Sequence, residues 1–184
     1  MKQQSGERTA FHDRELPYIP KKQHGKLKNA IRRFFYRWII KKYLTDCRTV
    51  MDIGAGFGAF YDMAKSMGKE VQGVDLDSQY IRDKIVKMDY RDIKGEYDCC
   101  FSSQFIEHVN QFGFMKVMQR CCKKVLIVIT PRPGKRFWDS PNHIRPYTKK
   151  AISRLYQGYG FKTVFMANLY PTRSFIVIGR KDGT

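Results

Sequence analysis

The sequence predicts an α/β protein in three layers: a mostly parallel sheet of seven strands between two layers of helices, with a last strand antiparallel to the others. Three observations support this. Short apolar runs rich in β-branched residues alternate with amphipathic segments along most of the chain. A glycine-rich turn at 54–58 joins the first such run to a helix. Only residues 170–173 separate the last two runs, which is too short for a parallel crossover.

Each element is expected from its local sequence. We predict strands at 49–53, 71–75, 85–89, 97–102 and 124–129, and helices at 58–67, 78–83 and 106–121. A Pro-rich loop at 130–146 follows. Thr148 is a suitable N-cap for a helix at 148–157, and Gly158 and Gly160 mark its end. Strands at 161–169 and 174–179 then close the sheet as an antiparallel pair.

Length and composition agree with a single globular domain. The chain has 184 residues, 42% of them hydrophobic, so it needs no disulfide or metal support. No C-x-x-C or Cys/His ligand spacing occurs, so we predict no metal site and buried free thiols at residues 47, 99, 100, 121 and 122. No stretch is long and apolar enough to span a bilayer, and no secretory h-region begins the chain, which favours a cytoplasmic protein.

Residues 49–60 read Thr-Val-Met-Asp-Ile-Gly-Ala-Gly-Phe-Gly-Ala-Phe, the most informative stretch of the chain. Glycines let a bulky ligand approach the backbone, and the helix start that follows presents unpaired N–H groups to a carboxylate or phosphate. Asp75, at the end of the next strand, is placed to bind ribose hydroxyls. Gly54-x-Gly56-x-x-Ala59 also fits a dinucleotide fingerprint. The antiparallel ending and the lack of a second nucleotide-binding half argue against a dehydrogenase.

Asp52 distinguishes this turn from a dinucleotide-binding turn, because it completes the pattern Asp-x-Gly-x-Gly-x-Gly. This pattern resembles the first motif of class I S-adenosylmethionine-dependent methyltransferases. Segments 71–77, 87–90 and 97–109 resemble that family's next motifs, in its order, and His-Ile-Arg-Pro-Tyr-Thr at 143–148 resembles its type 11 small-molecule branch. The likeness covers about residues 45–180 and implies a Rossmann-like methyltransferase domain at 45–184, with S-adenosylmethionine as cofactor and S-adenosylhomocysteine as product.

The resemblance also implies which residues bind the cofactor. In the family the first acid helps to hold the amino group, the glycines pass under the methionine part and the ribose, and an acid after the third strand receives the adenine amino group. Carried onto this sequence, the cofactor-binding residues are Asp52, Gly54, Ala55, Gly56, Gly58, Asp75, Leu76, Met88, Asp89, Tyr90, Ser102, Ser103 and Gln104.

His108 and His143 are the candidate catalytic residues. The acceptor attacks the sulfonium methyl in line with the departing sulfur, and a base helps only where the acceptor must lose a proton. Histidine suits this role because its unperturbed pKa lies near neutrality. Each candidate also has a structural alternative. His108 could cap a helix, Glu107 could favour a helix start through its charge, and Phe137 and Trp138 could anchor the loop to the sheet. Candidate substrate contacts are Glu107, Phe137, Trp138, Arg145 and Tyr147.

The N-terminal region and the charge bear on the acceptor. Residues 1–25 are polar and predict an arm or lid, and residues 26–44 predict a basic amphipathic helix. That helix could pack on the sheet or over the cofactor, lie on an anionic membrane surface, or contact nucleic acid. The formal net charge of +18 favours a polyanionic partner, with solubility alone as the alternative. Basic residues recur near the expected active-site rim at Lys123, Lys124, Arg132, Lys135, Arg136, Arg145, Lys149 and Lys150.

Three functions remain open at this stage. The first is methyl transfer to an oxygen or nitrogen of a small-molecule, lipid or glycan acceptor. The second is methylation of RNA or another nucleic acid across the basic surface, although no named RNA-binding module is visible. The third is a cofactor-binding partner subunit without catalytic activity.

Overall fold

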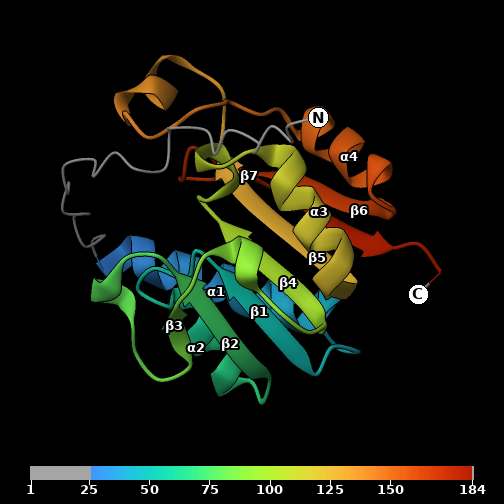
Figure 1. Ribbon diagram of the computed structural model, residues 1–184. Coiled ribbons are helices and arrows are strands. Elements are labelled where there is room, and N and C mark those ends of the chain that lie inside the picture. Colours follow the sequence, from blue (N-terminus) through green and yellow to red (C-terminus); the bar gives the residue numbers. More distant parts are fainter. Residues whose placement is uncertain (1–25, 184) are drawn as a thin grey trace, which may run out of the picture.

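Seven strands form one sheet in the order β3-β2-β1-β4-β5-β7-β6 (Figure 1). The computed structural model describes residues 26–183. Strands β1 to β5 pair in parallel, whereas β7 runs antiparallel to both β5 and β6. The predicted three-layer fold with an antiparallel last strand is confirmed. The strands are β1 (Thr49–Ile53), β2 (Glu70–Asp75), β3 (Ile85–Lys87), β4 (Tyr97–Ser103), β5 (Cys122–Pro131), β6 (Phe161–Leu169) and β7 (Ser174–Lys181).

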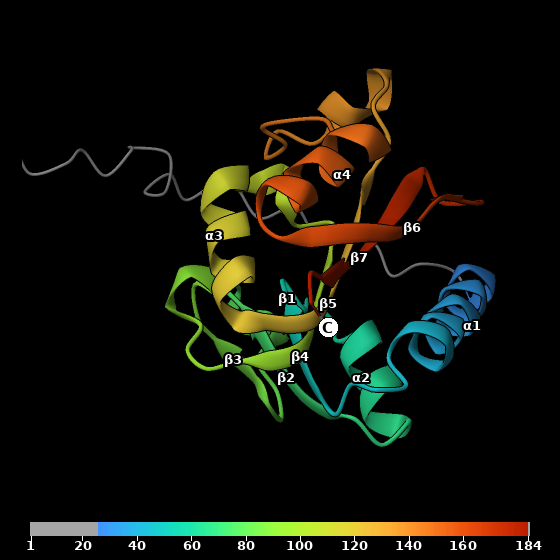
Figure 2. The ribbon, with the colours of Figure 1, turned by 90° about the vertical axis from the view of Figure 1, so that its right-hand side faces the viewer.

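Helices cover both faces of the sheet. Figure 2 shows α1 (Lys26–Tyr43) and α2 (Ala59–Ser66) on one side, and α3 (Gln111–Cys121) and α4 (Lys149–Gly158) on the other. On the first face, Phe60 of α2 stacks on Phe101 of β4 with ring centroids 3.6 Å apart. On the second face, Phe114 of α3 and Tyr156 of α4 are fully buried. These two apolar layers hold the sheet rigidly between them.

The strand order reverses beside β1, because the chain first adds β2 and β3 on one side and then β4 and β5 on the other. At such a reversal the loops that leave two neighbouring strands diverge, and a crevice opens at their carboxyl ends. The turns after β1 and β4 therefore meet at the natural ligand-binding edge of this sheet.

The helix predicted at 78–83 is wrong. Only a short 3-10 turn forms there, η1 (Ser78–Tyr80), and the chain then reverses through Asp83, whose φ is 50°. An α-helix cannot continue through a left-handed residue. Asp83 is fixed in place by α2, since its carboxylate accepts a hydrogen bond from the Tyr61 hydroxyl at 2.8 Å and pairs with Lys65 at 2.5 Å. The next strand ends at Lys87 rather than at residue 89, because Asp89 caps another 3-10 turn, η2 (Tyr90–Asp92).

The helix predicted at 106–121 is divided in two. A 3-10 turn, η3 (Ile106–His108), follows β4, and Val109 then adopts an extended conformation. The Asn110 side chain caps α3 by accepting hydrogen bonds from the backbone of Phe112 and Gly113, both at 3.0 Å. This break turns Glu107 and His108 toward the ligand-binding edge and separates them from α3.

Helix α1 packs on the sheet, as in one of the alternatives considered above. Tyr36, Ile39 and Ile40 are buried, and the Trp38 ring lies edge-on to Phe165 of β6 at 5.5 Å. Within residues 26–183, none of the helices has the length and hydropathy needed to cross a membrane. All five cysteines are buried free thiols, as predicted. The arm or lid predicted at residues 1–25 lies outside the described residues.

Candidate active site at the carboxyl edge of the sheet

The glycine turn after β1 is fastened to the end of β2. The backbone N–H groups of Gly54 and Ala55 both donate to the carbonyl oxygen of Val74, at 2.9 and 3.1 Å. Gly56 N–H donates to Asp75 Oδ2 at 2.8 Å. Gly54 and Gly56 have φ of 68° and 52°, which favours glycine. A Cβ at Gly54 would lie 2.5 Å from the Phe105 ring, whereas one at Gly56 would meet no described atom within 4 Å. The turn therefore leaves open space above Gly56, beside the Asp75 carboxylate.

A cavity of about 150 Å³ opens next to this turn. Its walls are mainly apolar and come from the ends of β1, β2 and β3 and from the segment after β4. Phe105 and Tyr90 meet edge to face in the wall, with ring centroids 5.5 Å apart. The predicted cofactor residues that line the cavity are Gly54, Asp75, Leu76, Met88, Asp89 and Tyr90. Phe105 was not predicted, because a lone aromatic residue after a strand carries no signal that separates a cavity wall from a core.

Asp52 lies behind the glycine turn and is 2% exposed. Its Oδ2 accepts a hydrogen bond from the backbone of Tyr61, at 3.2 Å, in the first turns of α2. Burial raises the pKa of this carboxyl to about 7, and the negative charge of Asp75 also raises it. The Asp52 carboxyl therefore exchanges its proton nearer to neutral pH than an exposed aspartate does. Asp75 keeps its own carboxylate oriented by a second backbone bond, from Asp77 N–H at 3.0 Å.

The acid predicted to receive the adenine amino group already has a partner. Asp89 lines the cavity, but its carboxylate pairs with the Arg91 guanidinium at 2.6 Å and accepts the Arg91 backbone N–H at 2.9 Å. An adenine amino group at this position would share the carboxylate with Arg91, a residue that the sequence reasoning missed.

The segment at the end of β4 contributes less than predicted. Ser102 is fully buried, Ser103 is partly buried, and the Gln104 side chain points to β7, where it donates to Ser174 Oγ at 3.1 Å. None of the three lines the cavity. Ala55 and Gly58 also lie outside its wall, since Gly58 starts α2 and packs against Ile85. The structure brings the β4 segment to the cavity through Phe105 instead.

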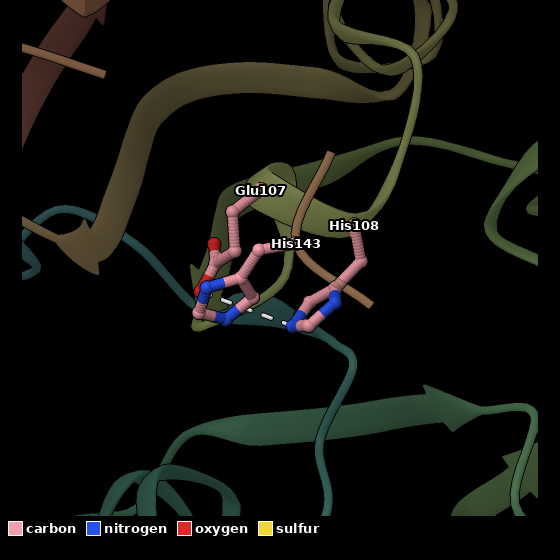
Figure 3. A group of neighbouring side chains, drawn as sticks. All are labelled: Glu107, His108 and His143. Carbon is pink, nitrogen blue, oxygen red and sulfur yellow. Dashed lines mark ion pairs between the residues drawn. The ribbon is translucent and has the colours of Figure 1, made fainter. Parts of the chain in front are cut away.

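Glu107, His108 and His143 come together beside the cavity (Figure 3). Glu107 is fully buried, and its Oε2 accepts a hydrogen bond from the Thr130 hydroxyl of β5 at 3.0 Å. The two imidazole rings lie 4.8 Å apart, centroid to centroid. Loop 132–146 brings His143 to this place by folding back over η3, where Ile144 N–H donates to the Glu107 carbonyl at 2.8 Å. The predicted catalytic histidines are therefore neighbours, although 34 positions separate them in the chain.

A second cavity, of about 520 Å³, lies on the other side of the histidine pair. Loop 132–146 and the turn between β6 and β7 form it, and Phe137 and His143 contribute to its wall. Four cationic side chains also line it, with Pro131, Pro133 and Gly134 between them: Arg132, Lys135, Arg136 and Arg173. His108 lines the first cavity and His143 the second, so the two rings stand where the cavities approach each other.

The structure corrects part of the predicted basic rim. Lys123 and Lys124 begin β5, at the amino ends of the parallel strands, so they lie at the edge of the sheet opposite the cavities. There Lys124 pairs with Asp98 at 3.2 Å and Lys123 with Glu96 at 3.8 Å. Arg173 takes their place at the rim, and no local pattern in the sequence indicates it.

The candidate substrate residues behave differently from one another. Phe137 is 3% exposed, lines the cationic cavity and contacts His143 with ring centroids 4.4 Å apart. Trp138 packs on Phe137 but is 60% exposed. Tyr147 lines neither cavity: it is buried, and its hydroxyl donates to Gln111 Oε1 at 2.9 Å. The interpretation of Tyr147 as a substrate contact is not supported, because it anchors loop 132–146 to α3. Arg145 is exposed and also lies outside both cavities.

Comparison with known proteins decides the cofactor class. Residues 51–129 match the family model for a methyltransferase domain of type 11. The chain therefore has a class I methyltransferase domain of the type 11 branch. A comparison with curated protein sequences gave no match.

Solved methyltransferases share the fold over most of their length. An S-adenosylmethionine-dependent methyltransferase from Archaeoglobus fulgidus is 18% identical with a TM-score of 0.65, covering 84% of this chain and 98% of that one. Magnesium protoporphyrin IX methyltransferase from Synechocystis PCC 6803, with bound S-adenosylhomocysteine, is 13% identical with a TM-score of 0.69, covering 88% and 89%. The Burkholderia thailandensis 1,6-didemethyltoxoflavin N1-methyltransferase is 14% identical with a TM-score of 0.64, covering 90% and 93%.

The cofactor of this methyltransferase is S-adenosylmethionine, and the smaller cavity fits its parts. The apolar wall formed by Met88, Tyr90 and Phe105 suits a purine ring. The Asp75 carboxylate suits the ribose hydroxyls, and the open space above Gly56 lets the ligand pass close to the backbone. Asp52 lies behind the same turn, and the resemblance to the family assigns the cationic amino group to this acid.

Proposed function

We propose that this methyltransferase transfers a methyl group to an oxygen of a small acceptor that also carries a carboxylate or phosphate. The observation that supports the proposal is the placement of the histidine pair. His108 lines the cofactor cavity, and His143 lines the cationic cavity, with the two rings 4.8 Å apart. An acceptor held in the cationic cavity would present its reactive atom to the methyl group at this junction.

The cationic cavity limits the chemistry of the acceptor. Four cationic side chains line it, and three of them are arginines, whose guanidinium groups match carboxylates and phosphates in two-pronged hydrogen bonds. Arg132 is further oriented by the Tyr170 ring, with its guanidinium carbon 5.0 Å from the ring centroid. These four charges would attract an anionic acceptor but would contribute no such attraction to a neutral one. An acidic acceptor would therefore bind more tightly than a neutral analogue of the same shape.

S-adenosylmethionine supplies the methyl group on a positively charged sulfur and leaves as S-adenosylhomocysteine. With the acceptor oxygen in line with the carbon–sulfur bond, the carbon–oxygen bond would form as the carbon–sulfur bond breaks, and the electron pair would pass to sulfur. A hydroxyl acceptor must also lose its proton. Glu107, His108 and His143 are the polar groups at the junction that can assist this step.

The test compares acidic and neutral acceptors. Labelled methyl transfer is screened against hydroxylated carboxylic acids, phosphorylated hydroxy compounds and their neutral esters. We expect transfer only to acidic members. The double variant Arg132→Gln/Arg173→Gln should raise KM for them roughly tenfold while leaving S-adenosylhomocysteine affinity unchanged, about 1.4 kcal/mol of lost binding. Lys162→Gln is the matched control, because Lys162 begins β6 at the opposite edge of the sheet. Equal KM values for the acidic acceptor and its neutral ester would refute the proposal.

The alternative functions and a membrane location each predict a different experimental result. A nucleic-acid acceptor would show binding that falls linearly with the logarithm of salt concentration, with a slope set by the number of phosphates contacted. A partner subunit without activity would bind S-adenosylhomocysteine but transfer no methyl group to any fraction of a cell extract. A protein on a membrane surface would bind anionic vesicles, and replacing the exposed Arg33, Arg37 and Lys41 of α1 by glutamine would abolish that binding without removing its buried face.

A further inference from the structure

Three side chains of types that bind metal ions meet at the junction of the two cavities. One carboxylate oxygen of Glu107 and one ring nitrogen each of His108 and His143 all lie within 4.8 Å of one another. His108 Nε2 is 4.0 Å from Glu107 Oε1. Figure 3 shows the three side chains converging from two segments of the chain. Spacing along the sequence does not reveal this set, and for that reason the sequence predicted no metal site.

Hydrogen bonds to the backbone determine which nitrogen of each ring carries the proton. His108 Nδ1 lies 2.9 Å from the Asn142 carbonyl oxygen, and His143 Nδ1 lies 2.6 Å from the Phe137 carbonyl oxygen. A carbonyl oxygen only accepts, so both Nδ1 atoms donate, and in the neutral rings Nε2 carries the lone pair. Histidines that bind metal ions have this arrangement, with the other ring nitrogen donating to a carbonyl or carboxylate.

The carboxylate is oriented in the same way. Glu107 Oε2 accepts the Thr130 hydroxyl at 3.0 Å, and Oε1 is the oxygen nearer to His108. The side chain is fully buried, so its negative charge is costly unless a positive charge or strong hydrogen bonds lie close to it. A divalent cation between Oε1 and the two imidazoles would supply that charge. Each of the three ligands would then have its own supporting hydrogen bond.

We propose that Glu107, His108 and His143 bind a divalent transition-metal ion such as Zn²⁺, Mn²⁺ or Fe²⁺. Two imidazoles and one carboxylate suit these ions, and three protein ligands leave coordination positions open. Ligands about 2.1 Å from one ion lie roughly 3.0 to 3.4 Å from each other. The 4.0 Å separation of His108 Nε2 and Glu107 Oε1 would therefore close by less than about 1 Å on binding, and the widest separation in the set, up to 4.8 Å, by less than about 2 Å, through rotation of the side chains.

The position of the ion suggests its use, a step that depends on the proposed function. His108 lines the cofactor cavity and His143 the cationic cavity, so the open positions would face the acceptor hydroxyl. A hydroxyl beside a divalent cation loses its proton at a lower pH. The proton passes to solvent, the oxygen forms its bond to the methyl carbon, and the bond between that carbon and sulfur breaks. No electron is gained or lost by the metal in this sequence.

The test measures metal binding without any acceptor. Protein freed of metal by a chelator is titrated with Co²⁺, and the bound ion is followed by its visible absorption and by elemental analysis. We expect one ion per chain, and no near-ultraviolet band of the kind that thiolate ligands give, since all five cysteines are buried elsewhere. His143→Ala and Glu107→Gln should each weaken Co²⁺ binding at least roughly tenfold. Glu96→Gln is the matched control, because Glu96 is an exposed carboxylate paired with Lys123.

Titration of each variant with S-adenosylhomocysteine serves as the control for folding, because a variant that still binds this ligand has kept its cofactor cavity. His143 does not line the cofactor cavity, so His143→Ala should keep its affinity for S-adenosylhomocysteine while losing Co²⁺. The inference is overturned if the wild-type protein binds S-adenosylhomocysteine but no stoichiometric Co²⁺, or if His108→Ala/His143→Ala binds as much Co²⁺ as the wild type. The rings would then only fix loop 132–146 to η3. Metal binding without methyl transfer to acidic acceptors would instead contradict the proposed function and leave the metal site standing.

Discussion

Asp52 should make cofactor binding depend on pH. Its carboxyl is 2% exposed, and burial raises its pKa to about 7. The ligand carries a cationic amino group, which the family places near this acid, so binding should favour the ionised carboxylate. Below pH 7 the protein must release the Asp52 proton before it binds the ligand, and that requirement weakens the apparent affinity.

The size of the effect follows from the pKa. If only the ionised form binds, the apparent association constant is proportional to the ionised fraction of Asp52, which rises from about one tenth at pH 6 to about nine tenths at pH 8. Affinity for S-adenosylhomocysteine should therefore increase about tenfold over this interval, ~1.4 kcal/mol. The effect of pH on folding stability has the opposite direction: stability falls as the pH rises. A carboxyl with a raised pKa contributes most below its ordinary pKa near 4, and the contribution is lost as the pH rises through about 7.

Calorimetric titration at pH 6, 7 and 8 measures this effect, with Asp52→Asn as the comparison. The asparagine oxygen can still accept the Tyr61 N–H, so the variant should fold and should bind weakly with a much flatter pH profile. The Tm of Asp52→Asn minus that of the wild type should increase between pH 5 and pH 8, because only the wild type loses stability as the carboxyl ionises. 5′-Methylthioadenosine, which lacks the amino group, should bind both proteins with equal pH dependence. A tenfold rise in affinity for S-adenosylhomocysteine that persists in Asp52→Asn would refute the role of this carboxyl.

Three further predictions concern the cofactor site and the break before α3. Gly56→Val should weaken S-adenosylhomocysteine binding at least roughly tenfold with little clash inside the protein, because the added side chain would enter open space at a φ of 52°; unchanged calorimetric affinity would contradict this. Asp75→Ala should weaken binding similarly by removing the ribose contact and the bond that orients Gly56 N–H, with Glu70→Ala, an exposed acid on the same strand, unchanged. Asn110→Ala should lower the free energy of unfolding by about 1 kcal/mol in denaturant titration, since it removes the cap of α3.

The fold could be predicted because its signals are local. Buried parallel strands read as short β-branched runs, and the four-residue link 170–173 alone requires an antiparallel pair. The wrong helix at 78–83 shows where this reasoning fails. The left-handed conformation of Asp83 is held by Tyr61 and Lys65 of α2, and such a tertiary contact has no signature in the six residues themselves.

The cofactor side of the site could be predicted from local sequence, whereas the acceptor side depends on tertiary contacts. The predicted cofactor residues that line the cavity lie on short turns after β1, β2 and β3, where the spacing from the strand end determines the position of each side chain. The acceptor side depends on loop 132–146, which hydrogen bonds of its backbone attach to η3 and to the β6–β7 turn. Ile144 N–H bonds to the Glu107 carbonyl at 2.8 Å, and Arg132 N–H bonds to the Arg173 carbonyl at 2.7 Å.

These backbone bonds constrain the path of the loop but not the identity of its side chains. Residues along it could therefore change the charge of the larger cavity without disturbing the sheet or the cofactor turn. The family's motifs accordingly predict the cofactor from the sequence. The acidic acceptor proposed above would bind Arg132, Lys135 and Arg136, which the sequence placed at the rim, and Arg173, which only the folded β6–β7 turn brings beside them. The histidine pair belongs to both sides, because His108 follows β4 directly and His143 arrives with the loop. An acceptor bound as proposed would thus be presented by the loop to a methyl group held at the carboxyl ends of β1, β2 and β3.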